Sequence, residues 1–269
     1  MTERNTQQDL RYTDHFGPRG PAVRGTVVVV PGRGETHDTY ARLGKRLAAD
    51  AYRVRVVDAA RLDAEDPDGS LTRLGGRIAD AVAGTADPDG AVVHPVILVG
   101  ADTGAVAVAA LLGLGREDGA AAAGLRPDAV VLAGLPARTT APPSGGWDDE
   151  LDVRTFCPAH RSTLTDDAAF GRGALDEVVP ERLLAAAYAS EADVPALILA
   201  GDADPLADRD ALTRTAKSLP RARLSVVRDA HHDVLNDMQH RSVAAEIVTF
   251  LETLRNELVP LVTVESSAW

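Results

Sequence analysis

The stretch Val96-Ile97-Leu98-Val99-Gly100-Ala101-Asp102-Thr103-Gly104 decides the fold of this 269-residue chain. Its first four residues form a continuous apolar run, which is typical of a strand buried on both faces of a sheet. Gly100 lies two residues before Asp102 and Gly104 lies two residues after it, and an apolar helical pattern continues to Leu114. The stretch therefore predicts a strand, a sharp turn at Asp102 and a helix, as in one unit of a parallel sheet.

Apolar runs and helical patterns alternate in the same way along most of the chain. We expect further strands at residues 25–30, 53–57, 129–132, 195–199 and 223–227. We expect the other helices near residues 37–50, 71–83, 181–190, 207–219 and 239–256. This alternation predicts the α/β class, with a mostly parallel central sheet flanked by helices.

The alternation weakens between residues 137 and 192, which contain Pro142-Pro143-Ser144-Gly145-Gly146 and a charged segment. This stretch is too long for a connection in a compact domain, so we interpret it as a small lid insertion. We therefore expect one domain whose core spans residues 25–136 and 193–256, with an N-terminal segment at 1–24 and a tail at 257–269. Within the tail, Val262-Thr263-Val264 could form an edge strand and pair across a homodimer, although a loosely docked end is the simpler interpretation.

The composition argues against several kinds of partner. The 40 acidic and 28 basic residues give a formal net charge of −12, so most of the surface would repel a nucleic acid. The single cysteine, Cys157, excludes an internal disulfide framework and a cysteine-based zinc cluster. The N-terminus is polar, and no stretch reaches the ~20 consecutive apolar residues of a membrane span. We expect a cytoplasmic protein without a metal site, a membrane partner or a nucleic-acid partner.

Polar residues follow several of the predicted strands. The first predicted strand is followed by the loop Pro31-Gly32-Arg33-Gly34-Glu35, and the strand at residues 96–99 is followed by the loop that contains Asp102. Two later strands are followed by Asp204 and by the pair His231-His232. Open α/β sheets place their ligand sites at the carboxyl ends of the strands. We therefore expect these loops to form one site for a small organic molecule. Low aromatic content, at 4%, mildly favours an aliphatic or mixed substrate.

With these residues in this order, the chain resembles the α/β-hydrolases over about residues 25–256. The order Asp102, Asp204, His232 matches the nucleophile, acid and histidine of that superfamily, and Gly100-Ala101-Asp102-Thr103-Gly104 matches its nucleophile elbow. Most members have serine at the elbow. An aspartate there resembles haloalkane dehalogenases, fluoroacetate dehalogenases and epoxide hydrolases. The resemblance implies the α/β-hydrolase fold and an enzyme that needs no cofactor.

An aspartate nucleophile suits attack on saturated carbon. A helix N-terminus keeps the Asp102 carboxylate ionised, and attack on an ester would give a reactive anhydride. The same carboxylate can open an epoxide or displace a leaving group, which forms an alkyl ester. By the resemblance, His232, oriented by Asp204, would activate water to hydrolyse this ester. Backbone N–H groups of Arg33 and Thr103 would form the oxyanion hole. Epoxide or carbon–halogen hydrolysis is therefore the leading expectation.

The sequence departs from both kinds of enzyme. Dehalogenases of this type commonly have tryptophan after the nucleophile, where this chain has Thr103, and epoxide hydrolases usually have two lid tyrosines, where this lid offers only Tyr188. Many relatives have histidine before the glycine that is Gly32 here.

The candidates for the substrate pocket are Gly32, Trp147, His160 and Tyr188, and Arg161 is a further candidate donor. A structural hydrogen-bond network is the simpler interpretation for the polar group Arg154, Cys157, His160 and Arg161, and a place in the lid core is the simpler one for Trp147 and Phe156.

Other interpretations stay open. Asp102 could be only the N-cap of the following helix, Asp202 competes with Asp204 for the acid role, and His231 competes with His232. The Arg33 side chain is most simply a solvated loop residue. Asp102 and His232 could act instead as an acid/base pair in a lyase, cyclase or isomerase of natural-product biosynthesis. The chain could also be a pseudo-hydrolase that only binds a ligand.

Overall fold

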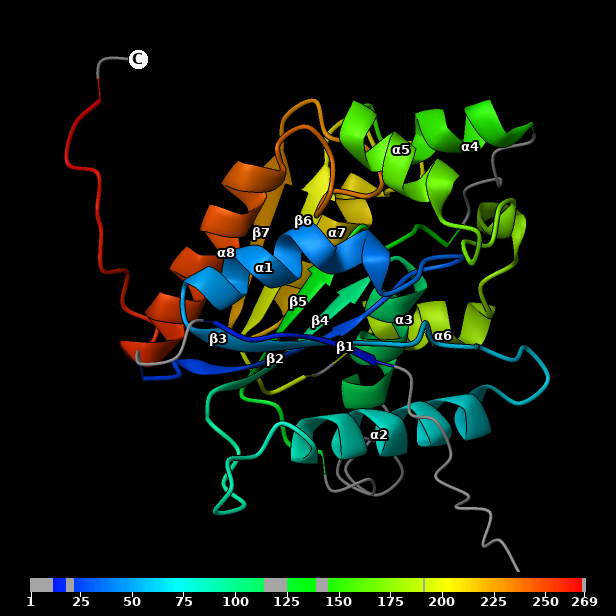
Figure 1. Ribbon diagram of the computed structural model, residues 1–269. Helices are drawn as coiled ribbons and strands as arrows, with labels where there is room; N and C mark the ends of the chain where they lie inside the picture. Colours follow the sequence, from blue (N-terminus) through cyan, green and yellow to red (C-terminus); the bar gives the residue numbers. More distant parts are fainter. Residues whose placement is uncertain (1–11, 18–21, 114–124, 139–144, 191, 268–269) are drawn as a thin grey trace, which may run out of the picture.

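The computed structural model describes residues 12–17, 22–113, 125–138, 145–190 and 192–267. Seven strands of this part form one sheet in the order β1-β3-β2-β4-β5-β6-β7, and every neighbouring pair is parallel except β1 with β3 (Figure 1). The strands are β1 (Tyr12–His15), β2 (Gly25–Val30), β3 (Tyr52–Val57), β4 (Val96–Ala101), β5 (Ala129–Ala133), β6 (Ala196–Gly201) and β7 (Ala222–Val227). The predicted parallel α/β sheet is therefore confirmed.

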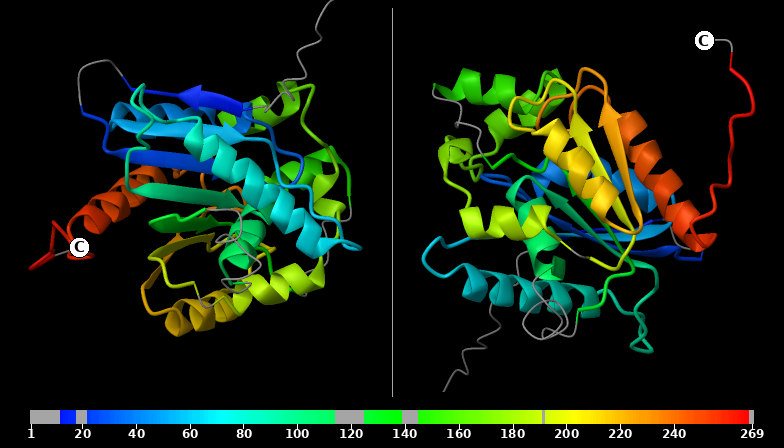
Figure 2. Two further views of the ribbon diagram at one scale, coloured as in Figure 1. Left: turned by 90° about the horizontal axis from the view of Figure 1, so that it is seen from below. Right: turned by 180° about the vertical axis from the view of Figure 1, so that it is seen from behind.

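Helices cover both faces of the sheet, because alternate strand residues point to opposite sides. Val27 and Val29 of β2 face a core formed with α1 (Ala41–Ala49) and α8 (His240–Arg255). Val28 and Val30 face the other core. The helices that contribute to that second core are α2 (Pro67–Ala83), α3 (Thr103–Gly113), α6 (Glu181–Tyr188) and α7 (Arg209–Ser218) (Figure 2).

Further helical elements lie in the segments that follow β2 and β5. The short 3-10 helix η1 (Asp38–Tyr40) leads directly into α1. The segment between β5 and β6, which we call the insertion, contains α4 (Trp147–Arg154), α5 (Pro158–Asp166), η2 (Ala174–Asp176) and α6. Figure 1 shows α4 and α5 above the ends of β4, β5 and β6. The chain therefore brings its insertion over the edge of the sheet where the sequence placed the site.

The two ends of the chain differ in how they compare with the expectations. The N-terminal segment contributes the edge strand β1, whose Asp14 receives two hydrogen bonds of 2.7 Å from Arg55 of β3. Val262-Thr263-Val264 forms no strand, and both of its valines are 81% exposed. The segment therefore does not form the edge strand that was one alternative, in agreement with the simpler interpretation of a loosely docked end. None of the described helices combines the length and apolarity needed to cross a membrane.

Candidate active site

Asp102 sits at a strained turn between β4 and α3. Its backbone has φ = 46°, in the left-handed region that residues other than glycine rarely adopt. A Cβ at Gly100 would meet the Gly104 carbonyl oxygen at 2.5 Å, and a Cβ at Gly104 would collide with the Val30 carbonyl oxygen. Both glycines are therefore needed for the close approach of this turn to its neighbours. The turn aims the Asp102 side chain at the loops that follow β2 and β7.

The structure brings the three predicted polar residues into one hydrogen-bonded chain. His232 Nε2 lies 3.2 Å from Asp102 Oδ1, and His232 Nδ1 lies 2.9 Å from Asp204 Oδ2. All three residues are buried. The competing candidates lie elsewhere, since His231 Nδ1 contacts Asp237 Oδ2 and Asp202 Oδ1 accepts the Asp229 backbone N–H. The three side chains form a chain of carboxylate, imidazole and carboxylate, which we call the relay; it has the arrangement of a Ser-His-Asp triad with a carboxylate in place of the hydroxyl.

The Arg33 side chain binds the Asp102 carboxylate directly. Arg33 Nε donates to Asp102 Oδ2 at 2.8 Å, and Arg33 Nη2 donates to Asp102 Oδ1 at 2.8 Å. The second terminal nitrogen, Nη1, donates to the carbonyl oxygens of Leu175 and Glu177 in the insertion. The prediction of a solvated Arg33 side chain was therefore wrong. A buried carboxylate beside the loop needs a cation, and Arg33 can reach both of its oxygens at once.

The predicted oxyanion donors lie at the elbow. The Arg33 backbone N–H donates to Asp102 Oδ2 at 2.9 Å. Within the described chain the Asp102 carboxylate accepts no hydrogen bond from the amides of α3, so its side chain does not cap the helix. Thr103 begins α3 and is buried, and its Oγ1 has no hydrogen-bond partner among the described residues. The Thr103 hydroxyl therefore has unused hydrogen-bonding capacity at the start of α3.

Opposing charges fix the protonation states of this relay. Burial alone would raise the pKa of Asp102, but Arg33 and His232 outweigh it and hold this pKa well below its usual range. Burial alone would lower the pKa of His232, but Asp204 and Asp102 raise it to about 10. Near pH 7 the resting site therefore contains ionised Asp102 and protonated His232.

Glu35 lies buried under the first loop and was not among the predicted site residues. Its Oε2 accepts the Gly32 backbone N–H at 2.6 Å and the hydroxyl of Tyr40. Burial and the charge of Asp233 raise the pKa of Glu35 to about 7. Gly32 itself packs against Asp102, since a Cβ there would lie 2.7 Å from the Asp102 Cβ. Glu35 and Tyr40 therefore hold the loop that carries Arg33 against the elbow.

A second buried support comes from the insertion. Arg154 of α4 is fully buried and donates to Glu150 Oε1 at 3.0 Å, to Asp233 Oδ1 at 3.4 Å and to the Arg33 carbonyl oxygen at 2.8 Å. His160 Nε2 lies 2.9 Å from Asp233 Oδ2. Arg154 and His160 thus form the structural network that was the simpler interpretation. This network ties α4 and α5 to the loops of both Arg33 and His232.

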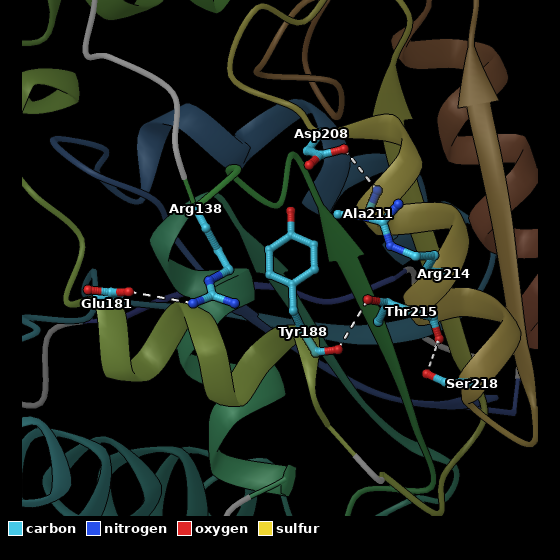
Figure 3. Close-up of a pocket in the computed structure, with 8 residues that line it drawn as sticks. All are labelled: Arg138, Glu181, Tyr188, Asp208, Ala211, Arg214, Thr215 and Ser218. Carbon is cyan, nitrogen blue, oxygen red and sulfur yellow. Dashed lines mark hydrogen bonds and ion pairs between the residues drawn. The ribbon is translucent and has the colours of Figure 1, made fainter.

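The other pocket candidates lie away from the elbow. Trp147 packs against Phe170 with ring centroids 5.5 Å apart, and Phe156 is 57% exposed beside His231, so only Trp147 has a place in the small core of the insertion. The Tyr188 hydroxyl donates to the Pro136 carbonyl oxygen at 3.1 Å. Figure 3 shows the Tyr188 ring between Arg138 and α7, in a cavity of about 480 Å³ that does not include the elbow.

A larger cavity of about 990 Å³ lies beside the elbow, and we call it the basin. Gly32, Arg33 and Thr103 are among the residues that line it, whereas Asp102 and His232 line a separate cavity of about 10 Å³. The loop 58–62 after β3 lines one side together with Arg77 of α2, and residues of the insertion line the other. This volume is within the usual range for a small-molecule site. The basin is therefore the candidate substrate site.

Known structures share this architecture. A soluble variant of monoglyceride lipase from Saccharomyces cerevisiae is 16% identical with a TM-score of 0.69, and the match covers 90% of this chain and 91% of that one. Monoacylglycerol lipase from Paleococcus ferrophilus is 16% identical with a TM-score of 0.67, covering 91% and 99%. The enol-lactonase from Burkholderia xenovorans is 18% identical with a TM-score of 0.57, covering 90% and 96%. No model of a protein family and no curated protein sequence matches the chain.

Identities this low establish the fold and nothing finer. The seven-stranded, mostly parallel sheet with helices on both faces is shared over almost the whole described chain. The chain therefore has the α/β-hydrolase fold, as its resemblance to that superfamily predicted.

Proposed function

We propose that this protein is a cofactor-free enzyme that hydrolyses an epoxide or a carbon–halogen bond in a small organic molecule. The observation that carries the proposal is the ionised Asp102 carboxylate at the elbow, hydrogen-bonded to a histidine that Asp204 holds from its other side. A carboxylate there cannot repeat the chemistry of a serine, because its attack on an ester would form an anhydride. Its productive targets are saturated carbons that carry a leaving group.

The first step forms an alkyl ester on Asp102. Asp102 Oδ1 attacks the carbon, its new C–O bond replaces the carbon–halogen bond or one epoxide C–O bond, and the electron pair leaves on the halide or the alkoxide. Asp102 Oδ2 keeps the Arg33 backbone N–H and becomes the carbonyl oxygen of the ester. Each carboxylate oxygen already accepts two hydrogen bonds, so Arg33 Nη2 must withdraw from Oδ1 before attack.

The withdrawn guanidinium supplies the donor that the sequence seemed to lack. It starts 2.8 Å from the attacking oxygen. Because displacement at saturated carbon sends the leaving group to the side opposite the attacking oxygen, the guanidinium must swing past the carbon to bring its N–H groups beside the departing halide or alkoxide. A cationic N–H donor stabilises the negative charge that develops there. Arg33 would thereby replace the tryptophan of dehalogenases or the tyrosine pair of epoxide hydrolases.

The second step hydrolyses the ester with His232 as base. Esterification removes the charge of Asp102, which is one cause of the raised pKa of His232, so His232 then gives up its proton more readily, to the epoxide-derived alkoxide or, after halide release, to solvent. Neutral His232 takes a proton from water, and the oxygen of this water attacks the Asp102 carbonyl carbon. The N–H groups of Arg33 and Thr103 stabilise the oxyanion. Collapse breaks the bond between this carbon and the substrate oxygen, which takes the proton from His232 and leaves as the alcohol or diol. The second proton of the water returns to His232, and Asp102 is again a carboxylate, with one water-derived oxygen.

The Arg33 clamp also favours a second candidate, in which Asp102 never attacks. A carboxylate whose hydrogen-bonding capacity is filled suits a pseudo-hydrolase that binds a ligand, or a lyase, cyclase or isomerase in which Asp102 and His232 exchange protons. The lowered pKa of Asp102 makes it a weak base, which counts against the acid/base reaction. Hydrolysis through an alkyl ester therefore remains the better-supported proposal.

Intact-protein mass spectrometry of His232→Gln tests the proposal. Removal of the base should stall the second step, so an epoxide or alkyl halide from a test panel should add its alkyl mass to Asp102. His231→Gln is the matched control, because the neighbouring histidine contacts Asp237 instead of Asp102 and should leave no adduct. In water enriched in ¹⁸O, repeated turnover by the wild type should place the label in Asp102.

Other results of this experiment separate the candidates. Product formation without label in Asp102 would establish acid/base chemistry and exclude the alkyl ester. Binding of panel members without product or adduct would support the pseudo-hydrolase. Rapid turnover of simple esters would overturn the argument against acyl transfer.

A further inference from the structure

The basin contains two arginines that have no partner in the described chain. Arg61 follows β3 and Arg77 lies on α2, and neither makes a hydrogen bond or ion pair. By contrast, Arg33, which also lines the basin, is bound to Asp102, and Arg73, one turn before Arg77 on α2, is bound to Asp66. A half-buried guanidinium without a counter-ion is costly, which makes Arg77 in particular unusual.

The carboxylates that line the basin leave these two cations available. Glu35 is held by Gly32 and Tyr40, and Asp58 Oδ1 lies 2.9 Å from His37 Nε2. Glu177 is exposed at the rim and forms no ion pair in the described chain. Burial lowers the pKa of Arg77, Asp58 raises it in part, and the neighbouring charge of Arg61 lowers it further. Arg61 and Arg77 therefore place two positive charges in a cavity of ligand size, and Asp58 offsets the charge of Arg77 only in part.

We propose that the substrate carries a carboxylate, and that Arg61 and Arg77 bind this group in the basin while the reactive carbon lies at Asp102. This inference rests on the proposed function, since it names the class of substrate that the same site takes. Guanidinium groups pair with carboxylates through two parallel hydrogen bonds, and partial burial strengthens such pairs. Halogenated or epoxidised acids are the resulting substrate class.

The position of the arginines also sets the orientation of the substrate. Gly32, Arg33 and Thr103 lie next to the elbow and line the same cavity as Arg61 and Arg77, so a substrate anchored on the two arginines can extend toward the elbow. The anchoring carboxylate and the attacking carboxylate repel one another less because Arg33 neutralises Asp102.

Calorimetric titration of hexanoate and hexanamide measures this preference without any reaction. The two probes have the same length and differ in charge, so the wild type should bind hexanoate about tenfold more tightly, which corresponds to about 1.4 kcal/mol. Arg77→Gln should remove most of that factor and leave hexanamide binding unchanged. Arg73→Gln is the control on the same helix and should keep the full preference, as it lies outside the basin.

Arg61→Gln tests the same point at an exposed position where folding is not at stake. Equal binding of both probes, failure of hexanoate to bind, or equal loss in Arg73→Gln and Arg77→Gln would overturn the proposal. With a reactive haloacid, Arg77→Gln should raise KM and leave kcat nearly unchanged. Hexanoate selectivity without an Asp102 adduct would refute the proposed chemistry alone, whereas an adduct formed equally well from neutral substrates would refute only the anion site.

Discussion

Replacement of Arg33 by glutamine perturbs the central electrostatic contact of the site. The Arg33 side chain donates two hydrogen bonds to Asp102 and two to carbonyl oxygens of the insertion, and the two side chains are only 10% and 4% exposed. Loss of one partner of a buried ion pair typically costs about 3–5 kcal/mol. Because His232 remains beside Asp102 and glutamine can keep one polar contact, we expect a loss of about 3 kcal/mol at pH 7.

Guanidinium chloride unfolding followed by circular dichroism measures this loss, and a thermal scan should show Tm lower by roughly 6–12 °C. Arg61→Gln serves as control, since Arg61 is exposed and unpaired in the same basin and its loss should cost no more than about 0.5 kcal/mol. The double variant with Asp102→Asn should show a coupling energy of about 2 kcal/mol between the two positions. A loss under about 1 kcal/mol, or additive effects in the cycle, would refute the claim that Arg33 neutralises Asp102.

The remaining predictions concern the elbow and two buried titratable groups. Gly104→Ala should destabilise the fold by more than about 2 kcal/mol in chemical unfolding, because its Cβ would collide with the Val30 carbonyl oxygen, whereas Gly76→Ala, in open space on α2, should stabilise it by about 0.5–1 kcal/mol. The raised pKa of His232 contributes stability that is complete below pH 6.5 and is lost as pH rises toward 10, so unfolding titrations of His232→Gln should depend less on pH in that window. The raised pKa of Glu35 contributes stability below pH 4.5 that is lost as pH rises through about 7, so Glu35→Gln should show a flatter stability profile over that interval in the same titrations.

The fold and the relay were predictable because their signals are local or ordered along the chain. The apolar run before Gly100 and the two glycines around Asp102 specify a strand, a sharp turn and a helix without reference to distant residues. Asp204 and His232 each follow a predicted strand, and parallel strands bring such residues to one edge. Strand β1 was not predicted, because four residues are too few to show the alternation of a strand. It is held by the ion pair between its Asp14 and Arg55 of the neighbouring strand β3.

The environment of the relay was not predictable, since it depends on where side chains point. The loop containing Arg33 gives no sign that its guanidinium turns inward to Asp102, because the same residues would serve equally well on a solvated turn. Burial of Glu35 follows from contacts with Tyr40 and Gly32 that exist only after η1 packs beneath the loop. The basin is likewise lined by Arg77, by a loop and by the insertion, which are remote from one another in the sequence. No single segment of the sequence therefore predicts the positive charge of the basin.

The charges of the relay explain why a resting site so firmly paired can still react. Two carboxylates, Asp102 and Asp204, face two cations, Arg33 and protonated His232, so the closed site is balanced. Esterification of Asp102 removes one negative charge and leaves the two cations with Asp204 alone. That imbalance weakens the hold on the proton of His232, which is the change that hydrolysis of the ester requires. The base of the second step would therefore become available as a consequence of the first chemical step.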